Sequence, residues 1–95
     1  MSLTQDIDRG QKAARLLADA VFIEAFDAVK AAIHQKWEES PIRDTEGQHE
    51  LRLMLKLLGD VRAYLETAVT DGKIAVDEVN RQNMLQTAAR KLRGM

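Results

Sequence analysis

The side chains best suited to binding a metal ion lie close together at one point of the chain. His49 has Glu46 three residues before it and Glu50 directly after it, which puts an imidazole and two carboxylates within one helical turn. A metal site needs further ligands that this group does not supply. The pattern therefore indicates polar side chains at the start of a helix, and it predicts neither a metal site nor a cofactor.

The remaining candidates for catalysis do not form a constellation. Ser2 and Ser40 have no histidine and carboxylate at a recognisable spacing, and the chain contains no cysteine nucleophile. Glu38 and Glu39 are adjacent, so on a helix their side chains point about 100° apart and do not form a catalytic pair. His34 lies beside an apolar helix face, where a half-buried or interface histidine is expected. No glycine-rich phosphate loop occurs. The sequence predicts a protein that is not an enzyme.

The basic residues are concentrated near the C-terminus. The formal net charge is only −1, but no acidic residue follows Glu78, and the last segment contains Arg81, Arg90, Lys91 and Arg93. Cations are favoured near the C-terminal end of a helix by the helix dipole. The alternative is that these four residues contact nucleic acid. The aromatic side chains expected of a single-strand-binding surface are missing from this segment.

Length and composition bound the fold. The 95 residues form a single domain, numbered 1–95, that is too small to bury a large core on its own. Disulfides and cysteine-based metal sites are excluded because there is no cysteine, which suits a reducing compartment. No apolar run approaches the roughly 20 residues that span a bilayer, so no membrane partner is expected.

The strongest periodic pattern predicts a helix over about 45–71. Its apolar residues recur at alternating steps of three and four, at Leu51, Met54, Leu58, Val61, Leu65 and Ala68. Four more widen this face on both sides, namely Leu55, Leu57, Tyr64 and Val69. Either Thr45, in a capping box with Gln48, or Asp44 is expected to cap the start. Gly72 is expected to end the helix in the left-handed conformation.

A second helix is predicted over about 20–39, with an apolar face formed by Phe22, Phe26, Val29 and Ile33 and with Trp37 beside it. Pro41 follows its end, and the short connection over 40–44 makes the flanking helices antiparallel neighbours. The fold class is therefore all-α, built on an antiparallel αα-hairpin over about 20–39 and 45–71.

Short flanking helices are expected over about 5–17, capped by Thr4, and over about 77–92, capped by Asp77. Asp19 either caps the 20–39 helix or lets it fuse with the first segment, and both arrangements remain open. Gly10 weakens the first helix by about 1 kcal/mol relative to alanine. The apolar faces of the flanking helices are thin.

The predicted hairpin has more apolar surface than its two helices can cover. Since the flanking helices offer little, we expect self-association into a homo-oligomer with coiled-coil-like helix packing. The residues expected in the core or the protein interface are Phe22, Phe26, Val29, Ile33, Trp37, Leu51, Leu55, Leu58 and Leu65.

Several short motifs resemble a known group of proteins. They are Arg9-Gly10, Ala14, Leu16-Leu17, Ala25-Phe26, Trp37, Ser40-Pro41, Arg43-Asp44, Glu46-Gly47, Met54-Leu55-Lys56 and Gly72-Lys73. Together they resemble small helical proteins of tailed phages and prophages that are encoded among packaging and head-assembly genes. The resemblance covers roughly residues 9–75 and leaves out the basic C-terminal segment.

The resemblance implies an accessory or structural role in virion assembly or DNA packaging, with phage structural or packaging proteins as partners. It implies a location in the host cytoplasm or in the virion. Two other functions remain open from the residues alone. One is a nucleic-acid-binding accessory that uses the basic C-terminal helix, and the other is a small regulator or inhibitor of a host protein.

Overall fold

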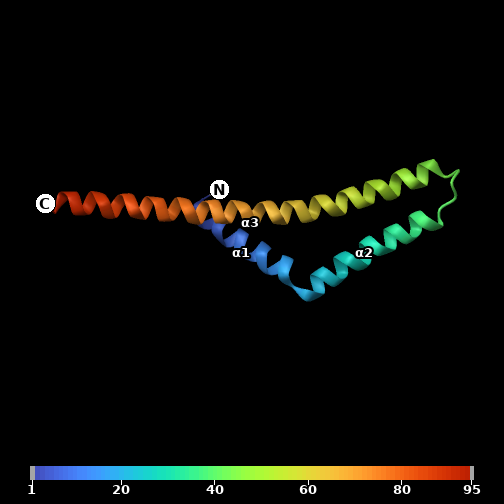
Figure 1. Cartoon of the computed structure of the whole chain (residues 1–95), viewed down its shortest axis with the longest axis horizontal. Helices are drawn as coiled ribbons and strands as arrows, with labels where there is room; N and C mark the ends of the chain where they lie inside the picture. The colour runs from blue at the N-terminus through green and yellow to red at the C-terminus, as the bar shows by residue number, and fades with distance from the viewer. Residues whose placement is uncertain (1, 95) are drawn as a thin grey trace.

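The structure, a computed structural model, describes residues 2–94 and consists of three helices in this range, with no strand. They are α1 (Leu3–Ala18), α2 (Ala20–Glu39) and α3 (Thr45–Arg93). In Figure 1, α3 runs the length of the molecule. Helix α1 crosses it near the middle and leaves it obliquely, and α2 returns from the bend to the far end of α3. The predicted all-α class is confirmed.

Helix α1 begins earlier than the sequence pattern predicts. Ser2, rather than Thr4, is the N-cap. The backbone N–H of Gln5 donates to Ser2 Oγ at 3.1 Å, and the Gln5 side chain accepts from the Ser2 backbone N–H at 3.2 Å. This capping box satisfies two of the backbone donors that a helix start leaves unpaired. Asp8 and Lys12 form an ion pair one turn apart on α1, with 3.1 Å between Lys12 Nζ and Asp8 Oδ2.

Asp19 separates α1 from α2, which decides between the two arrangements left open above. Its backbone is extended, and its own N–H donates to the carbonyl oxygen of Leu16 at the end of α1. Its carboxylate accepts from the backbone N–H of Phe22 at 2.9 Å at the start of α2. One residue thus closes one helix and opens the next, and the chain bends at this point (Figure 1).

Replacing Asp19 with alanine is expected to lower the free energy of unfolding by about 0.5–2 kcal/mol, since the substitution removes an N-cap. Alanine also favours the helical backbone, so α1 and α2 should partly fuse across the bend. Denaturant unfolding measures the first effect, and amide chemical shifts of residues 18–22 measure the second. Asp19→Asn retains a capping oxygen and should stay near the parent in both.

The connection between α2 and α3 is stabilised by local hydrogen bonds. Ser40 Oγ donates to the carbonyl oxygen of Trp37 at 2.6 Å. Asp44, rather than Thr45, caps α3, because its carboxylate accepts from the backbone N–H of Gly47 at 2.9 Å. The side chain of Gln48 donates instead to the carbonyl oxygen of Pro41 at 3.1 Å, across the turn.

The predicted break after residue 71 is wrong, because α3 is one helix of 49 residues. Gly72 has no positive φ, and Asp77 lies in the helix interior rather than at a cap. The separate helix predicted over 77–92 is therefore the last part of α3. A glycine that ends a helix needs the left-handed conformation. Gly72 keeps the right-handed helical conformation, and its missing side chain allows α1 to approach α3 closely.

The molecule is extended. Its Cα radius of gyration is 21.8 Å, whereas a compact domain of this length has a radius of about 12 Å. Helix α1, not α2, makes most of the contacts with α3. The packed αα-hairpin is not confirmed, because α2 diverges from α3 toward the bend (Figure 1).

Candidate protein-interaction surfaces

The closest packing in the molecule is the crossing of α1 and α3 at two glycines. A β-carbon on Gly10 would lie 2.9 Å from the Cα of Gly72 and 2.9 Å from the carbonyl oxygen of Ala68. Ala13 and Ala75 are also buried at this crossing. Small residues let two helix backbones approach closely and gain dispersion energy over many atom pairs. The spacing of Ala68, Gly72 and Ala75 is the sequence signal for this crossing, and the periodicity of large apolar residues does not contain it.

A shallow groove follows the same crossing, with a volume of about 410 Å³. Its walls include Ile7 and Ala14 from α1, and Val69 and Val76 from α3. The groove is open and mostly apolar, with Lys73 at its edge. It is a candidate for contact with an apolar side chain of another protein.

The predicted apolar face of α2 points toward α3 but is covered only in part. Ile33 is buried, Phe22 and Phe26 are half-buried, and Val29 and Trp37 are exposed. On α3 we define the inner seam as the half-buried residues Leu51, Leu55, Leu58 and Leu65. The predicted residues of the two helices therefore face each other. Because α2 diverges from α3, several of them are partly exposed to solvent.

Where α2 diverges, a cavity of about 250 Å³ lies between Leu17, Phe22, Ile23, Phe26, Asp27 and Arg62. The rings of Phe22 and Phe26 are 6.1 Å apart between centroids. The Arg62 guanidinium lies 5.8 Å from the Phe26 ring centroid, and its Nε donates to Glu66 at 3.2 Å. A cation over an aromatic face is attracted by the ring quadrupole. Arg62 thus lies on the inner side of α3, between Leu58 and Leu65 of the inner seam.

The flank of α3 beside the inner seam is rich in exposed apolar side chains. Met54 and Val61, predicted as seam residues, are about half exposed. Leu57 and Tyr64, predicted to widen the seam, are more exposed still. This correction has a geometric reason: α1 and α2 cover only the inner seam and the region of Gly72, so the other side of the predicted wide face remains in solvent.

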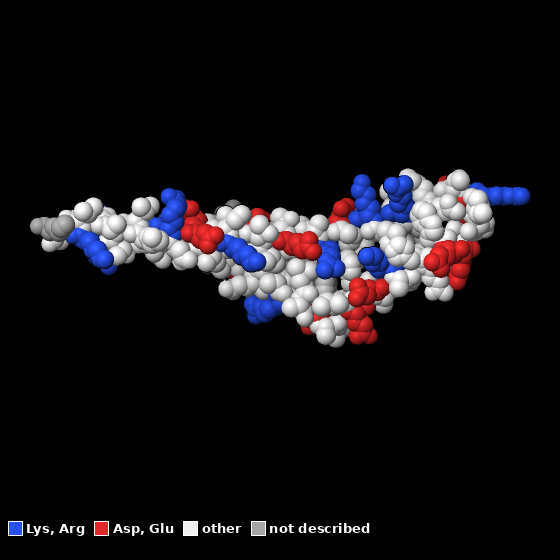
Figure 2. All heavy atoms as spheres, in the orientation of Figure 1, with Lys and Arg blue, Asp and Glu red and all other residues white. Residues whose placement is uncertain are grey.

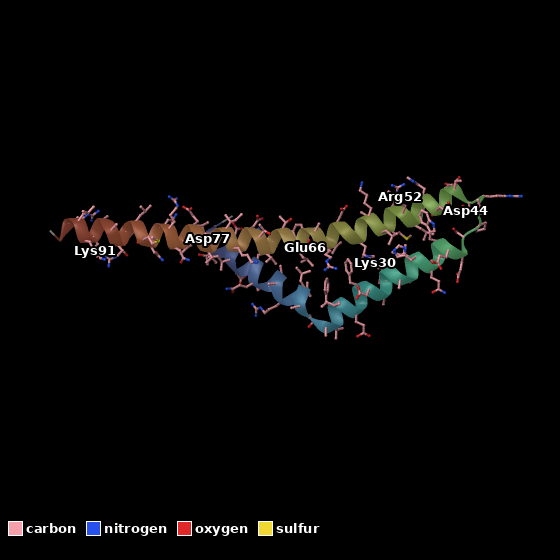
Figure 3. All side chains as sticks on the ribbon, in the orientation of Figure 1. Lys30, Asp44, Arg52, Glu66, Asp77 and Lys91 are labelled. Atoms are coloured by element: carbon pink, nitrogen blue, oxygen red, sulfur yellow. The ribbon has the colours of Figure 1, made fainter. Side chains whose placement is uncertain are left out.

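The last turns of α3 extend beyond α1 (Figure 1), and we call residues 79–94 the arm. Figure 2 shows blue and white atoms along the arm beyond the acidic group at its base, and Lys91 projects from the helix in Figure 3. Arg90, Lys91 and Arg93 are exposed. The structure does not gather the four predicted cations on one face, because they lie at different angles around one helix.

Arg81 is engaged by its own helix. Its guanidinium binds both carboxylate oxygens of Glu78, with 3.0 Å from Nε to Oε2. This hydrogen bonding, opposed by desolvation and aided by the charge of Arg81, lowers the pKa of Glu78 below its ordinary value. The same pair raises the pKa of Arg81. Because Glu78 neutralises it, Arg81 is a poorer phosphate ligand than the cations nearer the C-terminus.

His49, the candidate metal ligand, lines a hollow on α3 together with Arg52, Leu53, Leu55 and Lys56. Within residues 2–94, no group of three or more histidine, cysteine, aspartate or glutamate side chains is placed to hold a metal ion. His34 and His49 are exposed. Along the same stretch, no helix is both long enough and apolar enough to cross a bilayer.

Comparison with known protein families, with curated proteins and with solved structures finds no match for this chain.

Proposed function

We propose that this chain is a non-enzymatic helical module that self-associates and acts through protein–protein contacts. One observation carries the proposal: the exposed surface is too large for a lone domain. The accessible area is 7761 Å², about 2,200 Å² more than the roughly 5,500 Å² expected of a compact protein of 10.7 kDa. A standard protein interface removes about 800 Å² from each partner.

The kind of surface supports the same proposal. Within the described residues, no large side chain is fully buried, and the buried apolar residues are three alanines and Ile33. Large apolar side chains are exposed on all three helices. Large exposed apolar patches are typical of protein-interaction sites. Helix-face docking is the mechanism that fits such a surface.

The context we propose is phage particle assembly or DNA packaging, in the host cytoplasm or the virion, with structural or packaging proteins as further partners. This part depends on the resemblance of the motifs over residues 9–75. Deleting the gene from its phage or prophage is expected to reduce the yield of DNA-filled particles. A normal yield would contradict an assembly role and favour a regulator or inhibitor of a host protein.

Self-association is tested by size-exclusion chromatography with light scattering on the full chain over a wide concentration range. The expected mass is a multiple of 10.7 kDa. A mass of one chain at every concentration would contradict the proposal. Small-angle scattering adds a second measure, because an isolated chain with this structure has a Cα radius of gyration of 21.8 Å.

A nucleic-acid-binding accessory is the second candidate, supported by the exposed cations of the arm. Binding to DNA or RNA should then weaken steeply with salt, and the double substitution of Arg90 and Arg93 with glutamate should abolish it. No binding at low salt would remove this candidate.

A further inference from the structure

Helix α3 has a second heptad pattern, most of whose positions α1 and α2 leave exposed, although Asp71 and Glu78 are half-buried beside the crossing. We call it the outer seam. It begins two residues after the inner seam, so Leu53 follows Leu51 and Leu57 follows Leu55. Two residues correspond to about 200° around a helix, which places the two seams on nearly opposite sides. The steps of four and three then continue without interruption to Leu92.

Most positions of the outer seam are apolar and in solvent. Its six large apolar side chains are between 46% and 71% exposed, at Leu53, Leu57, Tyr64, Ile74, Leu85 and Leu92. Ala88 is a further apolar position, Thr67 is a small polar one, and both are exposed. Ile74 stays 62% exposed although α1 crosses α3 at Gly72, two residues away. Helix α1 therefore leaves the apolar positions accessible along the whole seam, which is about 58 Å long at 1.5 Å per residue.

We infer that a second copy of this chain packs on the outer seam, antiparallel, as a two-stranded coiled coil of α3 helices. The inference deepens the proposed self-association by naming its interface and orientation. The excess exposed area, about 2,200 Å² per chain, exceeds the roughly 800 Å² that each partner of a stable dimer buries.

The charged positions of the seam favour the antiparallel orientation, because no two of them then share a layer. When two copies pair in opposite directions with their seams centred on each other, each seam position faces a different seam position of the other copy. Leu53 then meets Leu92 of the other copy, and Leu57 meets Ala88. The charged positions Asp60, Asp71, Glu78 and Arg81 meet Leu85, Ile74, Thr67 and Tyr64 respectively.

These layers avoid electrostatic conflict. No layer of the antiparallel arrangement places two like charges together. Glu78 meets Thr67, whose hydroxyl group can donate a hydrogen bond to a carboxylate. Arg81 meets the ring of Tyr64, to which a guanidinium is attracted.

A parallel dimer would place equal residues in each layer. Asp60, Asp71, Glu78 and Arg81 would each face their own copy, giving four layers of like charge. The arms would also lie together. Each carries four of the fourteen basic residues and no acidic residue, a charge of +4, against −5 for the ten basic and fifteen acidic residues of the rest. The antiparallel orientation instead places the two arms at opposite ends of the seam.

The interface is tested first by matched charge substitutions in the full chain. Leu57→Glu is expected to weaken dimerisation at least about tenfold, since a buried leucine at such a layer is lost and a charge is introduced. Val21→Glu removes a comparably exposed aliphatic side chain, 72% against 64% exposed, from α2 outside both seams, and should dimerise like the parent. Circular dichroism checks that both variants remain helical. Equal dimerisation of all three proteins would place the interface elsewhere and overturn the inference.

Orientation is tested by disulfide cross-linking, which the absence of native cysteine makes unambiguous. Leu53→Cys and Leu92→Cys are made separately, then mixed and oxidised. The antiparallel dimer should give the mixed 53–92 product, with little 92–92 product. A dominant 92–92 product would overturn the orientation. A dimer that gives neither product would overturn the seam but leave self-association standing, whereas a single-chain mass throughout would remove both.

Discussion

Replacing Gly72 with alanine is expected to destabilise the molecule by about 1–3 kcal/mol, the usual cost of overpacking a close contact. The new β-carbon would lie 2.9 Å from the Cα of Gly10 and 3.1 Å from the carbonyl oxygen of Asp6. Both are backbone atoms, so relief requires α1 to move as a whole. Denaturant unfolding measures the loss, and hydrogen exchange across α1 should show that this helix is released first.

Gly59 provides the matched control, because it lies in the same helix and nothing lies within 4 Å of a β-carbon added there. Gly59→Ala should therefore stabilise the protein by about 0.5–1 kcal/mol, through helix propensity alone. The opposite signs of the two substitutions separate packing from propensity. If Gly72→Ala also stabilised the protein, the close crossing of α1 and α3 would be wrong.

Replacing Ile33 with alanine is expected to lower the free energy of unfolding by about 2–4 kcal/mol, in the range of large-to-small core substitutions. Ile33 is the largest buried apolar residue in the described part of the chain. Helix α2 has few other contacts with α3, so the packing of α2 on α3 depends on this side chain. Thermal or denaturant unfolding measures the loss, and amide exchange in α2 should rise with it.

Ile23→Ala makes the same chemical change on the same helix at a site that is 45% exposed, and should cost less than half as much. Near-equal losses of unfolding free energy at the two positions would mean that Ile23 is also buried in solution, for example by another copy. Repeating the pair of measurements at several protein concentrations distinguishes these cases, because only a contact between copies depends on concentration.

The sequence predicted the helical class, the turn over 40–44 and most of the helix ends, because these follow from local chemistry. Proline, capping residues and apolar periodicity act within a few residues of themselves. Asp19 is an example: its carboxylate caps α2 whatever the rest of the chain does. The N-cap of α3 was likewise narrowed to two neighbouring residues, Asp44 and Thr45, of which Asp44 is the cap.

Gly72 shows why the rest was harder to predict. A glycine followed by a lysine after a long periodic segment is typical of a helix end, yet here the helix continues for 21 more residues. The cost of a glycine within a helix, about 1 kcal/mol, is offset by the close approach of α1, a contact 62 residues distant in sequence. No local pattern contains that information.

The wide apolar face over 45–71 was recognised as a single surface, and the structure divides it. Leu55 and Leu58 turn toward α2, whereas Leu57 and Val61 remain in solvent. Periodicity identifies which residues share a side of a helix, but it does not say which neighbour covers that side. That depends on the bend at Asp19, where the chain lies far from α3 and from which α2 runs back toward it (Figure 1).

Because α3 is unbroken for 49 residues, it fixes the distance between the turn at one end and the arm at the other. Its length is about 73 Å, and the azimuth of each end is fixed relative to the other by the helical repeat. Inserting one residue beyond Gly72 would swing the arm by about 100°, whereas inserting seven would nearly restore its phase. A partner that binds both ends of α3 would therefore depend on the rotational phase between the two ends as well as on the length of the helix.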